Sequence, residues 1–142
     1  MIGKKVIIRT RLSTADAHYA GELVNGSKIL DFFGDVATEL CIRLDGDEGL
    51  FRTYEKVDFL QPIYAGDFME YHGWIEKMGN SSRTMQFEAY KVIELEKDPA
   101  LSDSAARVLK EPILCGTATG IVVVRKETQR GPQDPKFDVE RP

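Results

Sequence analysis

The sequence is poor in the residues from which metal and redox sites are usually built. It contains two cysteines, Cys41 and Cys115, and two histidines, His18 and His72, among 142 residues. The cysteines lack the close spacing of metal or thiol–disulfide motifs, so we expect two reduced thiols in a cytoplasmic protein. Two histidines are too few for a histidine-built metal site, and no metal is expected.

The sequence also lacks an excess of positive charge and any long apolar run. It has 19 basic and 23 acidic residues, giving a net charge of −4, so nothing general attracts it to nucleic acid or to an anionic membrane. No stretch approaches the length of a membrane-spanning helix. The apolar run near the start is too short for a signal peptide, and Arg9 and Arg11 interrupt it. We expect neither nucleic acid nor membrane as a partner.

What is present is one helical pattern among several strand-like ones. Apolar residues recur at spacings of three and four from Ser27 to about Leu44, which predicts a helix, and Gly46 is a plausible end. Strand-like runs occupy residues 4–12, 50–60, 67–78, 83–95 and 113–126. This order predicts an α+β fold in which an antiparallel sheet of about five strands carries one long helix on a face.

We expect one domain over residues 1–126, followed by a tail over residues 127–142. The tail is rich in proline and charge and should be poorly ordered unless something holds it. Residues 96–112 form a polar insertion that we expect to be mobile. One helix cannot cover both faces of the sheet. Residues 67–78 carry apolar or aromatic groups at both odd and even positions, so both faces of this predicted strand have apolar groups to bury. Self-association is therefore expected.

Several strings resemble the hotdog fold of acyl-CoA enzymes, in which a sheet wraps one long helix. They are "GELVNG", "DFLQPIYAGD" and "IEKMGNSS". A smaller branch of that fold, the β-aminoacyl-CoA ammonia-lyases, resembles the chain more closely and over nearly its whole length. The strings that carry this second resemblance are "DAHYAGELVNG", "GDVATEL", "GDFMEYHGWIEKMGNSS", "CGTATG" and "QRGPQ".

The resemblance implies a carbon–nitrogen lyase that eliminates ammonia from a 3-aminoacyl-CoA to give an enoyl-CoA. It favours 3-aminobutyryl-CoA as the substrate and crotonyl-CoA as the product, in anaerobic amino-acid (lysine) fermentation. No cofactor is needed, because the thioester acidifies the proton on C2 and CoA is part of the substrate. The implied assembly is a homodimer, further assembled into a hexamer as a trimer of dimers.

Such a reaction needs a base for the C2 proton, and three acids lie one helical turn apart in the predicted helix. Asp35 lies near the position where the resemblance places an active-site acid, so it is the first candidate. A solvated acid on the outer face of the helix is the alternative interpretation. That alternative is favoured for Asp31 and Glu39.

Three further residues are catalytic candidates. Asp58 lies in a predicted strand beside Phe59, which we predict to be a core residue. A strand acid facing Asp35 would supply paired carboxylates. Tyr54 has the same strand parity as Asp58 and could orient it, although a packed tyrosine is equally expected. His18, in the loop before the helix, could contact the thioester or simply make a structural hydrogen bond.

Candidate CoA contacts lie at the start of the helix and at a predicted turn. Backbone N–H groups of Asn25, Gly26 and Ser27 could bind the thioester oxygen or the pantetheine amides, although a simple helix cap explains the same residues. Arg130, in the tail, could reach a neighbouring subunit's CoA site. The candidates for the nucleotide phosphates are Lys77, Gly79, Asn80, Ser81, Ser82 and Arg83.

Two other functions remain open. An acyl-CoA thioesterase of the same fold would use Asp35 to activate or orient water, and a non-catalytic acyl-CoA-binding module would need only the CoA-side turn. A hydratase of the related enoyl-CoA type is disfavoured, because its aspartate and histidine five residues apart are absent: Leu40 stands five residues after Asp35.

Overall fold

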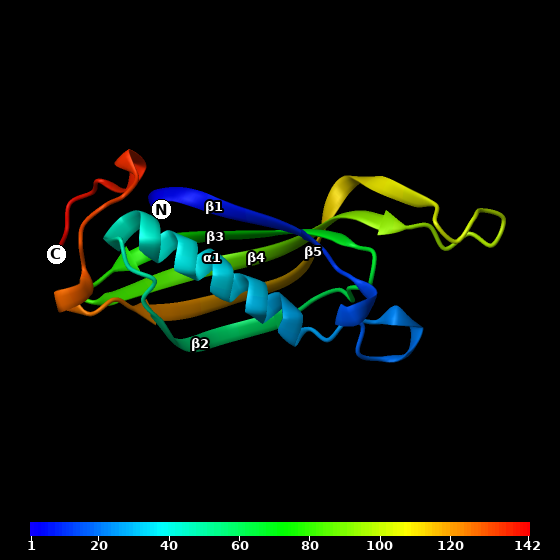
Figure 1. Ribbon diagram of the computed structural model, residues 1–142, viewed down its shortest axis with the longest axis horizontal. Coiled ribbons are helices and arrows are strands. Elements are labelled where there is room, and N and C mark those ends of the chain that lie inside the picture. The colour runs from blue at the N-terminus through cyan, green and yellow to red at the C-terminus, as the bar shows by residue number, and fades with distance from the viewer.

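The computed structural model describes all residues from 1 to 142 and has one sheet wrapped around one long helix (Figure 1). The five strands are antiparallel and lie in the order β1-β3-β4-β5-β2. The predicted α+β fold with about five strands and one helix is confirmed. The elements are β1 (Ile2–Arg11), α1 (Ser27–Asp45), β2 (Leu50–Phe59), β3 (Phe68–Met78), β4 (Ser82–Leu95) and β5 (Ala106–Val123).

Helix α1 forms where the apolar spacing predicted it. Its apolar stripe is buried against the sheet, with Phe33, Val36 and Leu40 fully covered. The helix ends at Gly46, whose left-handed backbone (φ 67°) lets its N–H donate to the Ile42 carbonyl at 2.9 Å. No helix of the chain is both long and apolar enough to cross a membrane.

The sheet buries one face against α1 and leaves the other without a helix (Figure 1). Along β3, Tyr71 and Ile75 are buried toward α1, whereas His72 and Trp74 point to the opposite face. Gly73 lets the helix approach closely, because a Cβ there would lie 2.5 Å from Val36 Cγ1. The uncovered face and the two edge strands leave surface available for association with further copies.

The predicted mobile insertion at residues 96–112 is wrong for its second half. β5 begins at Ala106 and pairs with the end of β4, with Val108 opposite Ile93, so that the two strands project from the body as an arm (Figure 1). An ion pair of 2.7 Å between Arg107 and Glu94 adds to this pairing. The strand extension depends on backbone pairing rather than burial, since Val108 is 75% exposed.

The tail is held against the domain and contains two short 3₁₀ turns, Lys126–Thr128 and Pro135–Phe137. Phe137 is fully buried and lies against Gly3, where a Cβ would come within 2.5 Å of its ring. The backbone N–H of Gln133 donates to the Arg43 carbonyl at 2.8 Å. The buried Phe137 is thus one anchor of the tail, and the polar composition of the tail did not reveal it.

Candidate functional site

A groove of about 390 Å³ opens beside the first turn of α1. It lies between the loop before the helix and residues 59–63, which lead from β2 toward β3. A mostly apolar groove of this kind suits an acyl chain or a pantetheine arm. The side chains and backbone that line it belong to Tyr19, Leu23, Val24, Asn25, Gly26, Ile29, Phe59, Leu60, Gln61, Pro62 and Ile63.

Two backbone N–H groups at this groove remain unpaired within the chain. The Ser27 N–H donates to Asn25 Oδ1 at 3.1 Å, and the N–H groups of Lys28 and Ile29 donate to the carbonyls of Asn25 and Gly26. The N–H groups of Asn25 and Gly26 themselves donate no hydrogen bond in the chain. Of the three predicted residues, Ser27 is therefore used in capping, and Asn25 and Gly26 keep donors that a thioester oxygen could accept from.

Phe59 is not the core residue that the sequence predicted. Its side chain is 57% exposed, and its ring lies so close to the helix start that a Cβ on Gly26 would be 3.0 Å from it. Tyr19 and Leu60 are also about half exposed at the same groove. Exposed aromatic and apolar groups gathered at one concave site are typical of a ligand or subunit contact.

The carboxylates of α1 differ in their surroundings. Glu39 forms an ion pair of 2.9 Å with Arg43, one turn further along the helix. Asp31 and Asp35 are both exposed, and neither side chain makes a hydrogen bond or an ion pair within the chain. Asp35 thus has no partner in the chain, as a solvated surface acid also would not.

Asp58 and Asp35 are not brought together within one chain. A register shift in β2 between Tyr54 and Lys56 changes the strand parity, so that Tyr54 and Val57 pack against the core. Asp58 points to the other face of the sheet, where it lies 3.8 Å from Lys56 Nζ and is 46% exposed. The paired carboxylates of the prediction would require a second chain.

Tyr54 does not orient Asp58; of the two interpretations left open by the sequence, the packed tyrosine is the one found. Its hydroxyl donates to the Leu30 carbonyl at 2.9 Å and so fastens β2 to α1. Burial, reinforced by the nearby Asp31 charge, raises the pKa of Tyr54 to about 12. The hydroxyl therefore stays protonated at neutral pH and serves as a structural donor.

His18 lies in the exposed loop next to the groove without lining it. Its ring packs edge-on against Tyr19, with the two ring centres 4.6 Å apart. Its backbone N–H donates to the Leu23 carbonyl at 2.9 Å. Because Tyr19 is part of the groove wall, His18 could reach a bound substrate only from the rim.

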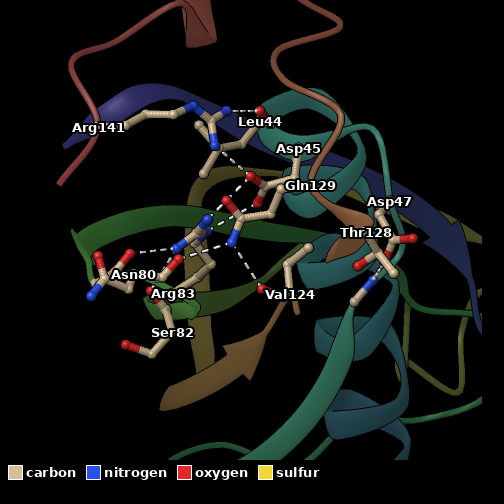
Figure 2. A network of polar contacts seen from close by, with 12 residues as sticks. Leu44, Asp45, Asp47, Asn80, Ser82, Arg83, Val124, Thr128, Gln129 and Arg141 are labelled. Carbon is tan, nitrogen blue, oxygen red and sulfur yellow. Dashed lines mark hydrogen bonds and ion pairs between the residues drawn. The ribbon is translucent and has the colours of Figure 1, made fainter. Parts of the chain in front are cut away.

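The turn at residues 79–82 lies at the other end of α1, where Figure 2 shows a network of polar contacts. Arg83, predicted to meet phosphate, is instead 1% exposed. Its Nε and Nη2 donate to the Asp45 carboxylate at 3.0 and 3.1 Å, and its Nη1 donates to the carbonyls of Gly79 and Ser82. Arg83 thus holds the turn from inside and cannot contact a ligand.

Asp45 also receives a second guanidinium, from the end of the tail (Figure 2). Arg141 Nη1 lies 2.7 Å from Asp45 Oδ1, and Arg141 Nη2 donates to the Leu44 carbonyl. Asp45 is fully buried, so its charge is balanced by protein groups alone. One carboxylate thereby joins the helix end, the sheet and the tail.

Lys77 and Arg130 are exposed near the same turn, where a phosphate could reach them. The Arg130 backbone N–H donates to the Asp45 carbonyl at 2.7 Å, and its Nη1 donates to the Gly46 carbonyl at 3.2 Å. This end of α1 is about 28 Å from the groove, judged from the rise of a 19-residue helix.

A second cavity, of about 290 Å³, lies at the base of the β4–β5 arm. Six carboxylates line it; three of them are paired with Lys91 or Arg107, which leaves three acids and the exposed Lys97. A CoA phosphate would be repelled there, so this cavity is not part of the proposed site. The acids are Glu22, Asp67, Glu94, Glu96, Asp98 and Asp103. No group of three or more His, Cys, Asp or Glu side chains is arranged to hold a metal ion.

Sequence reasoning missed Asp45 and Arg141. Asp45 lies 38 positions from Arg83 and 96 from Arg141, so no local pattern connects them. One signal was available: an acid immediately before the helix-ending Gly46 is unfavourable beside the negative end of the helix dipole. An acid in that place indicates a cation nearby.

The fold is that of a known class. Residues 21–95 match the family model described as the Thioesterase superfamily. A hexameric hotdog fold thioesterase of Campylobacter jejuni superimposes with a TM-score of 0.68 at 16% identity, over 92% of this chain and 90% of the other. The protein is therefore a hotdog-fold member of the Thioesterase superfamily.

Two relatives narrow this class. The chain is 51% identical over 126 residues to the 3-aminobutyryl-CoA ammonia lyase of Acetoanaerobium sticklandii. The aligned residues make up 89% of this chain and 98% of that protein. The structure of β-alanyl-CoA:ammonia lyase from Clostridium propionicum matches with a TM-score of 0.95 and 49% identity, over the full length of both chains. The chain belongs to the family of β-aminoacyl-CoA ammonia lyases, within the carbon–nitrogen lyases.

The buried ion pair between Arg83 and Asp45 should stabilise the fold. Asp45→Ala leaves Arg83 buried without a carboxylate, so we expect the free energy of unfolding to fall by about 3–5 kcal/mol in urea titrations. Asp47→Ala is the control: it removes an acid two residues away that accepts only the Gly49 N–H, and should cost about 1 kcal/mol. Equal stability of the two variants would contradict a structural role for the pair.

Proposed function

We propose that this protein eliminates ammonia from 3-aminobutyryl-CoA to give crotonyl-CoA. The observation that carries the proposal is the 51% identity to a 3-aminobutyryl-CoA ammonia lyase over 98% of that relative's length. The groove at the start of α1 agrees with it, because its apolar lining suits a short acyl chain. The two buried cysteines are free thiols, which fits the reducing conditions of the cytoplasm.

The substrate would bind by its two ends. The acyl group lies in the groove, and the thioester oxygen accepts hydrogen bonds from the free N–H groups of Asn25 and Gly26. The nucleotide phosphates lie at the turn of residues 79–82, near Lys77 and Arg130. Support for this placement comes from the unpaired donors at the groove and the exposed cations near the turn.

The two ends belong to different chains in this proposal. In a single chain the groove and the turn are at opposite ends of α1, about 28 Å apart. Phe59 and Leu60 are also exposed where β2 forms an edge of the sheet, which favours a contact with a second copy. We propose a homodimer with two shared sites, assembled further into a trimer of dimers.

The chemistry is a base-assisted elimination. A carboxylate takes the proton from C2, and the electron pair passes through an enolate whose oxygen the backbone N–H groups stabilise. That pair then forms the C2–C3 double bond as the C3–N bond breaks. The substrate's ammonium group leaves as ammonia, and the proton taken by the base returns to solvent. No cofactor takes part in these steps.

Asp35 is the proposed base. It is an exposed carboxylate with no partner in the chain, as Asp31 also is, and it is preferred because it lies near the position where the family resemblance places an active-site acid. Asp58 would join the same site only from the second chain, where it could hold the leaving ammonium group. His18, at the rim of the groove, is the next candidate for the base.

The function is tested by incubating the protein with crotonyl-CoA and ammonium and separating the products by mass. We expect 3-aminobutyryl-CoA to form, because elimination is reversible. Release of free CoA without amination would indicate a thioesterase instead. Tight binding of crotonyl-CoA with no turnover would indicate an acyl-CoA-binding module.

The base is tested with a nearly isosteric substitution. Asp35→Asn removes the basic oxygen and the charge, so turnover should fall by roughly 10²–10⁴-fold while CoA binding is kept. Asp31→Asn is the matched control, one turn away and equally exposed, and should change turnover little. Exchange of the C2 proton with deuterated water should be lost in Asp35→Asn. If that variant keeps normal exchange and turnover, Asp35 is not the base.

A further inference from the structure

The turn between β3 and β4 is fixed through its backbone carbonyls. Arg83 Nη1 donates to the carbonyls of Gly79 and Ser82 at 2.8 and 3.0 Å (Figure 2). The Ser81 carbonyl accepts from the Val124 N–H at 2.8 Å. Three of the four carbonyls of residues 79–82 are therefore bound by the sheet itself.

The fourth carbonyl, that of Asn80, is bound by the tail. Gln129 Nε2 donates to it at 2.8 Å and to the Val124 carbonyl at 3.0 Å (Figure 2). One side-chain amide thus bridges the tip of the turn to the end of β5, using both of its N–H groups. It is the only contact between the tail and the tip residue Asn80 that involves a hydrogen bond.

Gln129 is itself placed by its neighbours in the tail. The next residue, Arg130, donates its backbone N–H to the Asp45 carbonyl at 2.7 Å, and Gln133 donates its own to the Arg43 carbonyl at 2.8 Å. Both acceptors lie in the last turn of α1. The amide of Gln129 is therefore held from a rigid element rather than from a free chain end.

Because the carbonyls of the turn are bound by the protein, some of its backbone N–H groups remain free. With its carbonyls turned toward the protein, the tip leaves the backbone N–H groups of Asn80 and Ser81 without any acceptor in the chain. Successive free N–H groups at a turn form a concave anion-binding site. Their direction is set by the peptide planes, and the plane between Asn80 and Ser81 contains the carbonyl that Gln129 holds.

We propose that Gln129 is a positioning residue that aims the Ser81 N–H of the turn at the phosphates of the CoA thioester. It touches no substrate atom and acts through the peptide between Asn80 and Ser81. This inference rests on the proposed function, because it takes a CoA thioester as the ligand. It adds a second residue of the tail, after Arg130, to those that act at the phosphate site.

The test compares a substrate that has phosphates with one that lacks them. Gln129→Ala removes both hydrogen bonds, and Gln129→Met removes them while keeping the length of the side chain. Gln133→Ala is the matched control: the same residue type in the same tail, whose side chain bonds only to the Gly131 carbonyl. For each variant, KM and kcat are measured with the CoA thioester and with the corresponding N-acetylcysteamine thioester.

We expect KM for the CoA thioester to rise about tenfold in both Gln129 variants, as the loss of one hydrogen bond from the Ser81 N–H to a charged phosphate implies. The kcat value and KM for the N-acetylcysteamine thioester should stay within about twofold, and Gln133→Ala should match the unsubstituted protein. An equal change for both thioesters, or no change for either, would overturn the proposal, since the first indicates general loosening and the second no role.

The role of Gln129 can be tested separately from the proposed lyase activity. If the unsubstituted protein eliminated no ammonia, the dissociation constant of CoA, measured by calorimetry against that of pantetheine, would replace KM. A tenfold loss confined to CoA in the Gln129 variants would still support the positioning role. Unchanged affinity for CoA would refute it independently of any catalysis.

Discussion

The buried ion pair between Arg83 and Asp45 is the contact on which the arrangement at one end of the molecule depends. It joins the last residue of α1 to the start of β4, and its remaining donors fix the turn at residues 79–82. Arg141 adds the tail to the same carboxylate. A charge removed from water in this way is tolerable only with every donor satisfied, so the pair imposes one geometry on helix, turn and tail together.

The second constraint is that one helix, α1, covers one face of the sheet and has the two candidate binding features at its opposite ends. The start of α1 offers an apolar groove with free N–H donors, and its end offers a fixed turn beside exposed cations. These features suit the two ends of a CoA thioester, yet one chain holds them at opposite ends of the same helix. The family assignment therefore fits an assembly in which one chain binds the acyl end and another the nucleotide end.

The parts of the structure that follow from local periodicity could be predicted from the sequence. The helix and four of the strands appear close to where apolar spacing and Gly46 indicated them, whereas β5 begins at Ala106, before its predicted start at residue 113. The sequence predictions that were wrong concerned residues whose positions depend on distant contacts or on irregular strands. The register shift in β2 moved Asp58 to the face away from α1, and Arg83, which resembled an exposed turn residue, is buried by a partner 38 positions away. Phe137 likewise gave no sign of its burial against Gly3.

A complementation experiment tests the shared site most directly. One variant, Gly26→Phe, fills the groove, and the other, Asn80→Asp with Ser81→Asp, places negative charge at the turn, so each should be nearly inactive alone. Co-expression should restore about a quarter of the unsubstituted activity, because half of randomly assembled dimers are mixed and one of their two sites is intact. Mixed assemblies no more active than either parent would contradict a site built from two chains.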